Sequence, residues 1–318
     1  MVLSVVRRVG RSLLVVLLVT MAVTLLLSLA PGSVAEVVLG PSSTPESVAA
    51  MESKLGLDQP LWAQYGDWLA GAVRGDLGES PVTGQPVATA IVERLPVTLE
   101  LAALALVLAL AVAVLLAVAS AGRPGSPADR AINALSSVFL SVPAFIAGPV
   151  LIYFFAVKAG WFPVTGWARV SEQGLGANLR AAALPVVAIA LTEVASFHRL
   201  LRTDLVGTLR EDYVEAARAK GLGRGYVMVR HALRPSSFSL VTLAGLSLGR
   251  LIGGTVIVES LFGLPGLGQL MAASITQRDL VTVQGTVVFI AVVYVVVNML
   301  VDLSYQLIDP RVRKAARA

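Results

Sequence analysis

Cysteine is absent from the 318 residues, and histidine occurs only twice, at His198 and His231. The chain therefore has no disulfide, no thiolate nucleophile and no cysteine-based metal site, and two histidines are too few for a histidine-rich one. Charged residues are also scarce, since they make up 14% of the chain while hydrophobic residues make up 56%. Soluble domains average about 25% charged and about 45–50% apolar residues, so this composition predicts a protein that crosses a membrane several times.

Sequence motifs for catalysis are also missing. No glycine is followed directly by a lysine. The chain therefore lacks the phosphate-binding loop in which backbone amides and a lysine hold the phosphates of ATP. The His-Glu-x-x-His motif of zinc proteases is absent too. We therefore predict that the chain is not an enzyme and that energy for any transport arrives through a partner or an ion gradient.

Six long apolar stretches predict six transmembrane helices, because about 20 apolar residues cross roughly 30 Å of hydrocarbon. They cover residues 13–29, 95–119, 131–157, 181–201, 238–258 and 281–303. A secretory signal peptide is the alternative for the first stretch, but its apolar run exceeds the usual length of about 7–15 residues. Pro143 and Pro149 predict a kinked third helix, and Gly245, Gly249 and Gly253 predict a close helix contact along the fifth.

The distribution of charge predicts how these helices are oriented. Residues 199–234 carry eight Arg or Lys, whereas residues 31–95 carry eight acidic and three basic residues. By the positive-inside rule the first segment is cytoplasmic and the second external, and both termini lie inside. The net charge of +5 reflects this topology, since no separate basic domain exists, and we predict no nucleic acid partner.

Two further expectations concern residues 31–95 and the second span. Helices are predicted from Pro45 to Gly56 and over residues 60–74, and the apolar face of the latter needs a partner. The membrane domain or the bilayer interface would fit, as would a solute-binding protein.

Pro96 is predicted to open the second span, which would place Glu100 in its first turn, where the helix dipole favours a carboxylate.

The most distinctive stretch is residues 211–234, which read EDYVEAARAKGLGRGYVMVRHALR. Good helix formers precede Gly221, so a short helix should end at this glycine. A second helical pattern follows and should be limited by Pro235. The sequence thus predicts a bent loop of two helices on the cytoplasmic side.

This loop resembles the EAA loop of ABC importer permeases, in which Glu-Ala-Ala is followed by three residues and a glycine. The matching residues are Glu215, Ala216, Ala217 and Gly221. More narrowly, DYVEAARAKGL followed by RHALRP resembles the B-type permease of dipeptide and oligopeptide importers, and so do RLPVTLELA, SVPAFIAGPVLIYFF and VIVESLFGLPGLGQL. One departure is that His231 takes an apolar place of the family pattern and Pro235 comes one position late. The resemblance covers about residues 8–314.

The resemblance implies an all-α polytopic membrane protein with six transmembrane helices and the type I ABC importer permease (MetI-like) fold. Residues 1–318 would form a single permease domain, with an external loop region at 31–95 and a cytoplasmic coupling loop at 199–235. It implies a multi-pass protein of the bacterial cytoplasmic (inner) membrane that imports dipeptides or oligopeptides. Nickel chelates and glutathione are alternative cargoes in the same family.

The implied partners are a second homologous permease, two ABC ATPase subunits and an extracytoplasmic solute-binding protein. No cofactor is implied for this chain, because the ATPase subunits would bind ATP and magnesium. Coupling to these subunits is expected at Glu215, Ala216, Ala217, Lys220, Gly221 and Leu222.

Charged residues in or near the apolar spans are candidates for the transport pathway or for structural pairs. They are Glu193, Arg250, Glu259 and Asp302. For Arg250 we expect either a buried pair with Glu193 or a contact with a peptide carboxylate. Asn298, Asp302 and Tyr305 fall on one face of the sixth span. Asp302 is therefore predicted to pair with a basic residue at the cytoplasmic face, such as Arg199 or Arg202, although hydration there is an alternative.

Two other functional classes fit a polytopic membrane protein. A gradient-driven transporter would carry buried carboxylates along its pathway and often a duplicated half, and this chain has few of the former and no visible duplication. A membrane receptor or scaffold would transport nothing. Co-purification with two ATPase subunits would favour the importer over both.

Overall fold

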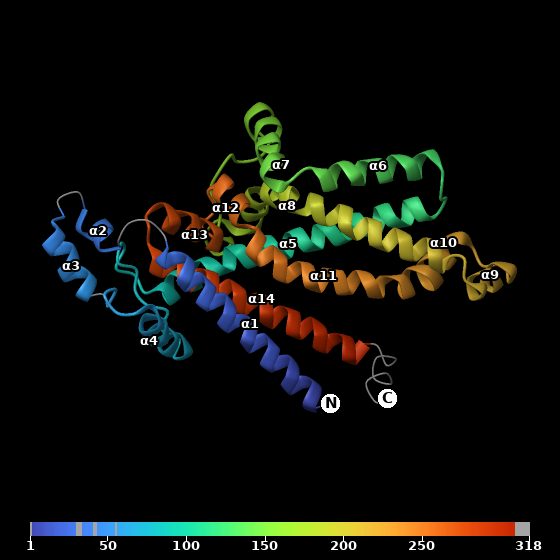
Figure 1. The fold of residues 1–318 in the computed structure, drawn as a ribbon. Helices are drawn as coiled ribbons and strands as arrows, with labels where there is room; N and C mark the ends of the chain where they lie inside the picture. Colours follow the sequence, from blue (N-terminus) through green and yellow to red (C-terminus); the bar gives the residue numbers. More distant parts are fainter. Residues whose placement is uncertain (1, 30–33, 41–42, 55, 309–318) are drawn as a thin grey trace. The chain divides into compact units, whose positions relative to one another are not determined.

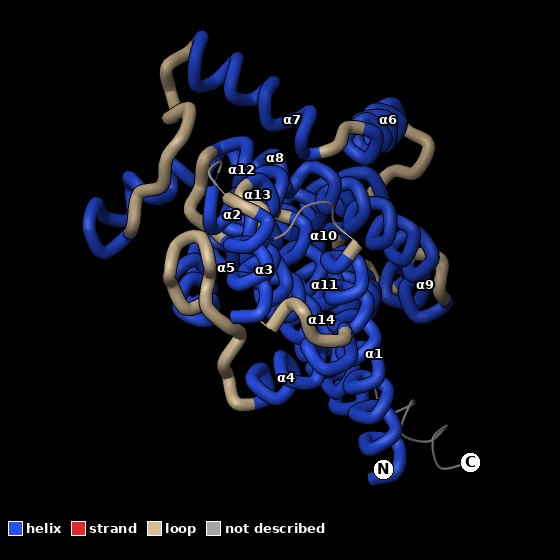
Figure 2. Tube along the Cα trace, turned by 60° about the vertical axis from the view of Figure 1, so that its left-hand side comes forward, coloured by secondary structure: helices blue, strands red, loops and turns tan. Residues whose placement is uncertain are grey.

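The computed structural model describes residues 2–29, 34–40, 43–54 and 56–308. In this part of the chain the regular elements are helices joined by loops (Figure 2), apart from an isolated bridge between Glu79 and Pro86. The all-α prediction is therefore confirmed. The chain forms two compact units, one of Met1–Thr98 with Pro265–Met299 and one of Leu99–Leu264 with Leu300–Ala318.

The first unit is made of helices from two chain segments, residues 1–98 and 265–299 (Figure 1). They are α1 (Val2–Ser28), α2 (Val34–Leu39), α3 (Pro45–Lys54), α4 (Leu61–Val73), the start of α5 (Val87–Ala121), α13 (Leu267–Thr276) and most of α14 (Leu280–Ile308). The predicted helices at Pro45 and at residues 60–74 are present as α3 and α4. The Tyr65 hydroxyl lies 2.8 Å from Thr20 Oγ1, so α4 contacts α1, but no residue of α4 is buried and its apolar face stays partly exposed.

The second unit is built around α8 (Val170–Thr208), whose buried side chains include Phe197, Leu201 and Leu205. The other elements are the rest of α5, α6 (Pro127–Ser141), α7 (Ala144–Leu151), the π-helix η2 (Ile152–Lys158), α9 (Asp212–Ala219), α10 (Arg224–Tyr226), the π-helix η3 (Val227–Leu233), α11 (Arg234–Gly254) and α12 (Val256–Phe262). Helices α6, α7 and α11 all pack against α8.

The described residues contain five helices long and apolar enough to cross a membrane, or up to seven spans if each bent helix pair counts as one. One such pair occupies the predicted third span. There α6 and the α7–η2 segment meet at 101°, with Pro143 at the break (Figure 2). The predicted interruption is confirmed at Pro143, where it is a break in the helix and not a mild kink, whereas Pro149 lies inside α7 and does not interrupt it.

The second span begins earlier than the sequence predicts. Helix α5 starts at Val87 and continues through Pro96, so Glu100 lies more than three turns inside the helix and not in its first turn. Val87 and Ile91 are buried against Leu267 and Leu270 of α13. This packing stabilises the extra turns, and a proline inside a membrane helix is tolerated where neighbouring groups satisfy the freed backbone.

The prediction that Pro235 ends a helix is wrong. Residues Arg224–Gly254 form one continuous helical stretch, in which Pro235 occupies the first turn of α11. The turn immediately before it, η3, is π-helical. A π-turn bonds each amide one residue further back than an α-turn does, and this local change accommodates a residue that has no amide hydrogen.

The predicted close contact along the fifth span is confirmed at Gly245. A Cβ atom added to Gly245 would lie 2.6 Å from Cγ2 of Val301 in α14, so only glycine permits this approach. Beyond α11, the helix breaks between Phe262 and Leu267, where Gly263 adopts φ +62°. This break lies within VIVESLFGLPGLGQL, one of the segments that resemble the family.

Candidate functional site

Helix α9 ends in a complete glycine C-cap. Gly221 has φ +79°, its amide donates to Arg218 O at 2.9 Å, and the amide of Leu222 donates to Ala217 O at 3.3 Å. These two bonds define the Schellman motif, in which glycine supplies the left-handed residue. The sequence-predicted helix stop at Gly221 is therefore confirmed, and the chain turns sharply there.

Both helices of the loop are held together by a small apolar core. Val214 and Ala217 on α9 are buried with Val227 on η3, and Leu209 packs against them. The Tyr213 hydroxyl also donates to the backbone carbonyl of His231 at 3.2 Å. The loop is thus a folded helical hairpin that can move as one body.

The hairpin is fixed to the two long helices that enter and leave it. Thr208 Oγ1 at the end of α8 lies 2.9 Å from Ser236 Oγ at the start of α11. Figure 1 places α9 and α10 at the same end of this unit as the turn between α5 and α6. A force on the hairpin therefore acts directly on the ends of α8 and α11.

The predicted coupling residues divide into two groups. Glu215, Ala216, Lys220, Gly221 and Leu222 are exposed, whereas Ala217 is buried in the core of the hairpin. Ala217 therefore supports the hairpin from inside and is not part of its outer surface. The exposed surface also carries large apolar side chains, namely Tyr213, Leu222, Tyr226 and Val229. A surface that mixes charge with exposed apolar groups suits docking to another protein.

Glu193 and Arg250 are paired, as one of the two sequence interpretations predicts. Arg250 Nη2 donates to Glu193 Oε1 at 3.1 Å and to Oε2 at 3.2 Å, and also to Ser247 Oγ at 2.9 Å. The Glu193 side chain is 8% exposed and that of Arg250 is 60% exposed. The carboxylate is thus held inside the helix bundle, while much of the guanidinium faces outward.

Ser247 also lies in a Gly-x-Ser-x-Gly pattern, Gly245–Gly249, which occurs in hydrolases on a strand-to-helix turn. Here the pattern lies inside α11 and its serine accepts from Arg250, so it is not a nucleophile elbow. Among the residues that the structure describes, no group of three His, Asp or Glu side chains could hold a metal ion.

The two remaining candidate charges lie elsewhere. Glu259 in α12 is fully buried and accepts a 2.8 Å hydrogen bond from Thr255 Oγ1. The side chain of Asp302 lies outside the described residues, so its pairing stays a prediction. Arg202, one of its predicted partners, is bound to a different carboxylate.

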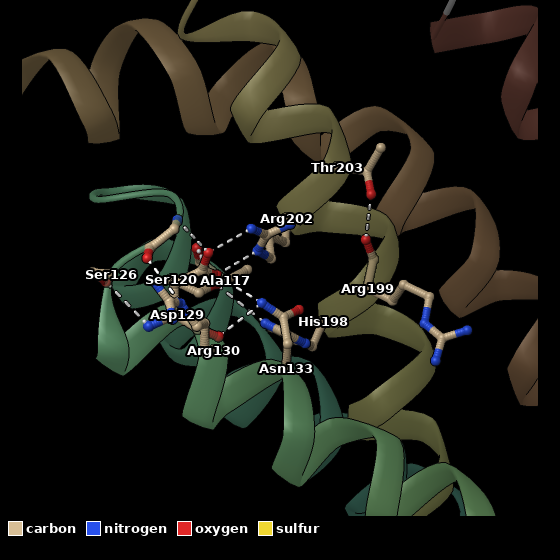
Figure 3. Close-up of polar contacts among 11 residues, drawn as sticks. Ala117, Ser120, Ser126, Asp129, Arg130, Asn133, His198, Arg199, Arg202 and Thr203 are labelled. Atoms are coloured by element: carbon tan, nitrogen blue, oxygen red, sulfur yellow. Dashed lines mark hydrogen bonds and ion pairs between the residues drawn. The ribbon is translucent and has the colours of Figure 1, made fainter.

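That carboxylate is Asp129, which the sequence did not single out (Figure 3). Arg202 Nε donates to Asp129 Oδ1 and Nη2 donates to Oδ2, both at 2.7 Å. Such a bidentate pair is among the strongest polar contacts in proteins. The only sequence signal for Asp129 is its place three residues after Ser126, whose hydroxyl accepts from the Asp129 amide as a helix N-cap.

His198 lies one turn before Arg202 on the same face of α8 and is fully buried. Its Nδ1 lies 2.8 Å from Ser136 Oγ on α6, and its Nε2 lies 3.2 Å from Ser120 Oγ on α5. Ser120 Oγ also donates to Ala117 O. A neutral ring with its proton on Nε2 satisfies all three bonds at once.

Comparison with known families identifies the chain. Residues 113–314 match the family model for the binding-protein-dependent transport system inner membrane component, and residues 1–102 match the model for the N-terminal part of such membrane components. The chain therefore belongs to this family of inner-membrane transport components. It is a multi-pass permease component of an ABC transporter, a family whose members are not themselves enzymes.

Individual relatives cover nearly the whole chain. A putative peptide transport system permease of Brucella abortus is 38% identical over 307 residues, which are 96% of this chain and 98% of the relative. An oligopeptide transport system permease of Bacillus subtilis is 34% identical and covers 97% of this chain and 98% of its own length. A glutathione transport system permease of Escherichia coli is 32% identical, with 93% and 94% covered.

Among solved structures, an amino acid ABC transporter crystallised with histidines shares the fold. The superposition has a TM-score of 0.52 at 18% sequence identity and covers 69% of this chain and 94% of the other. At this identity the likeness concerns the fold alone.

Proposed function

We propose that the chain is one of two permease subunits of an ABC importer that carries dipeptides or oligopeptides. The observation that carries the proposal is the hairpin of α9, α10 and η3, which has an exposed mixed surface, its own core and direct attachment to α8 and α11. The cargo follows from the relatives, because permeases named for peptide transport match this chain over almost its full length.

The mechanism needs no covalent chemistry in this chain. An ATPase subunit docks on the exposed residues Glu215, Ala216, Lys220 and Leu222, and its closure on ATP displaces the hairpin. Because the hairpin is rigid, the displacement is passed to α8 and α11, and the spans change between inward-open and outward-open arrangements. Gly221 permits the turn that presents this surface, and Ala217 holds the two helices of the hairpin together.

The proposed complex contains a second homologous permease, two ATPase subunits that bind ATP and magnesium, and an external solute-binding protein. This chain contributes a single permease domain with six spans and both termini in the cytoplasm. Residues 31–95 lie outside and residues 199–235 form the cytoplasmic coupling loop. The eight basic residues of 199–234 and the acidic excess of 31–95 support this orientation.

Glu193, Arg250 and Glu259 are proposed to serve the membrane domain, as structural charges or at the edge of the pathway. The outward-facing part of the Arg250 guanidinium is suited to meet either the second permease or a carboxylate of the cargo. Asp302 is proposed to tie the last helix to the basic cytoplasmic face.

The test is uptake by the reconstituted complex in proteoliposomes. With a labelled dipeptide and its binding protein present, uptake should require ATP inside and should stop when this permease is omitted. Competition with unlabelled glutathione and with a nickel chelate identifies the alternative cargoes. Uptake that is driven by a sodium or proton gradient without ATPase subunits would overturn the proposal.

A further inference from the structure

We propose that Asp129, Arg202 and His198 are positioning residues that lock α6 to α8, so that a displacement of the coupling hairpin also moves α6. The inference rests on the proposed function, because it takes the hairpin to be the part that the ATPases displace. It adds α6, and the broken span that α6 begins, to the helices moved by the hairpin.

The lock acts at two levels along the helices, and Figure 3 shows the first of them, between Asp129 and Arg202. Asp129, in the first turn of α6, binds Arg202, and Ser136, about two turns further along α6, binds His198, about one turn earlier on α8. The two helices therefore run in opposite directions, with two polar contacts between them. Contacts at two levels fix both the register and the rotation of one helix against the other, which is the best-attested use of buried polar groups.

The carboxylate of Asp129 has no capacity left for another partner. Oδ1 also accepts from Asn133 Nδ2 at 2.7 Å, and Oδ2 also accepts from the Gly125 amide at 2.8 Å. Asp129 is 3% exposed, so releasing Arg202 would leave a charge in a dry site. Sliding of α6 along α8 would break this set of bonds, and the two helices are therefore expected to move together.

The lock lies between the hairpin and the broken span. Arg202 is less than two turns from the end of α8 at Thr208, where the hairpin begins. On the other side of the lock, α6 runs to Pro143 and the 101° break. The hairpin also lies close to the turn that precedes α6, since a Cβ atom built on Gly122 would be 3.9 Å from Met228 Cε. Motion at α9 thus has a continuous path through α8 and α6 to the break.

The first test measures motion in the assembled transporter. Since the chain has no cysteine, spin labels can be placed at Ser137→Cys on α6 or Thr203→Cys on α8, both exposed positions, in a complex with otherwise cysteine-free subunits. Each is paired with a fixed label on the second permease, and distances are measured by electron resonance with and without trapped ATP. Trapping should shift both distances together.

The outcomes separate the two hypotheses. If the Thr203 distance shifts and the Ser137 distance does not, α6 does not follow α8 and the inference is wrong. If neither distance shifts, the hairpin is not a lever, and the proposed function itself fails at this point.

The second test uses variants at the lock. In Asp129→Asn or Arg202→Gln the amount of ATP hydrolysed per peptide imported should rise roughly two- to thirtyfold, the range expected for residues that transmit coupling. Arg202→Lys should lie between, because an ammonium makes a single contact where the guanidinium makes two. The control is Thr203→Ala, on the same helix, whose exposed hydroxyl donates only to the backbone carbonyl of Arg199 one turn earlier (Figure 3).

A purely structural role predicts something different. It would reduce the quantity of assembled complex but leave the ATP used per peptide unchanged in the complex that does assemble. That result, or an equal effect of Thr203→Ala, would overturn the assignment of Asp129 and Arg202 as positioning residues.

Discussion

At some positions of this chain, the backbone conformation decides which residue type fits as much as side-chain chemistry does. Gly221 has φ +79°, and a Cβ atom built there meets no atom within 4 Å. The requirement for glycine is therefore conformational, since a side chain would fit in space but not at this backbone angle. Gly245 shows the opposite case, because its conformation is helical and the space beside it is filled by Val301.

Replacement of Gly221 by valine should uncouple the transporter. A β-branched residue at positive φ costs about 1–2 kcal/mol or more, so the C-cap should open and change the angle between α9 and η3. We expect lower stimulation of the ATPase by peptide-loaded binding protein. The matched control is Gly223→Val in the same loop, where φ is −62° and valine is tolerated. Equal stimulation in Gly221→Val and the unaltered protein would contradict the role of the hairpin.

The Glu193–Arg250 pair should show measurable coupling energy. Glu193→Gln and Arg250→Gln, alone and together, form a double-mutant cycle on thermal unfolding of the purified permease. Because the two side chains are in direct contact inside a membrane span, we expect a coupling of about 0.5–3 kcal/mol. Additive effects would show that the bond does not contribute in the membrane domain. Loss of uptake with little loss of stability would assign the pair to the pathway.

Helices in this protein are extended or joined by their neighbours beyond what local sequence signals predict. Helix α5 continues through Pro96 because its first turns are buried against α13. Helix α11 contains Pro235 in its first turn because a π-helical segment precedes it. Helix α4 lies on α1 through Tyr65 and Thr20. For α5 and α11, a contact with another element or a local change in the type of helix overrides the proline that would otherwise end the helix.

The contact between α11 and α14 gives a test at this scale. Gly245→Ala places a Cβ atom 2.6 Å from Val301, and such overpacking typically costs about 1–3 kcal/mol. The unfolding temperature in detergent should therefore fall. Gly10→Ala in α1 is the matched control, because nothing lies within 4 Å of its added Cβ and alanine is the better helix former by about 1 kcal/mol. An equal change in both variants would rule out a specific close contact at Gly245.

At the scale of the whole molecule, helix length and charge together bear on the number and the direction of the spans. The helices alone allow five to seven spans. The basic segment 199–234 and the acidic segment 31–95 favour six, with these two segments on opposite sides. An arrangement with an odd number of spans would put the two termini on opposite sides of the membrane.

Single cysteines test this topology directly, since the chain has none of its own. Glu46→Cys in α3 and Ala219→Cys in α9 are both exposed positions. In intact cells, a thiol reagent that does not cross membranes should label the first variant, and should label the second only after permeabilisation. Labelling of both variants in intact cells would refute the six-span arrangement.

The sequence by itself determined the class of the protein and the outline of the site. Because charged residues are scarce, the sequence predicts a membrane protein. The residues from Glu215 to Gly221 encode the end of a helix with a glycine C-cap, which depends on local interactions only. Local signals of this kind act within one or two turns, so they can be read without a fold. The Glu193–Arg250 pair was also predictable, because an ionisable group inside a span needs a partner and few were available.

Only the tertiary structure decided which distant residues meet. Asp129 and Arg202 are 73 residues apart in the chain, and the one local signal at Asp129, the capping Ser126, concerns its own helix, so nothing local indicates that they pair. The burial of Ala217 and the extension of α5 through Pro96 likewise depend on surfaces supplied by other helices. Packing and hydrogen bonding between elements are set by their three-dimensional arrangement, which is why the lock between α6 and α8 appears in the structure and not in the sequence.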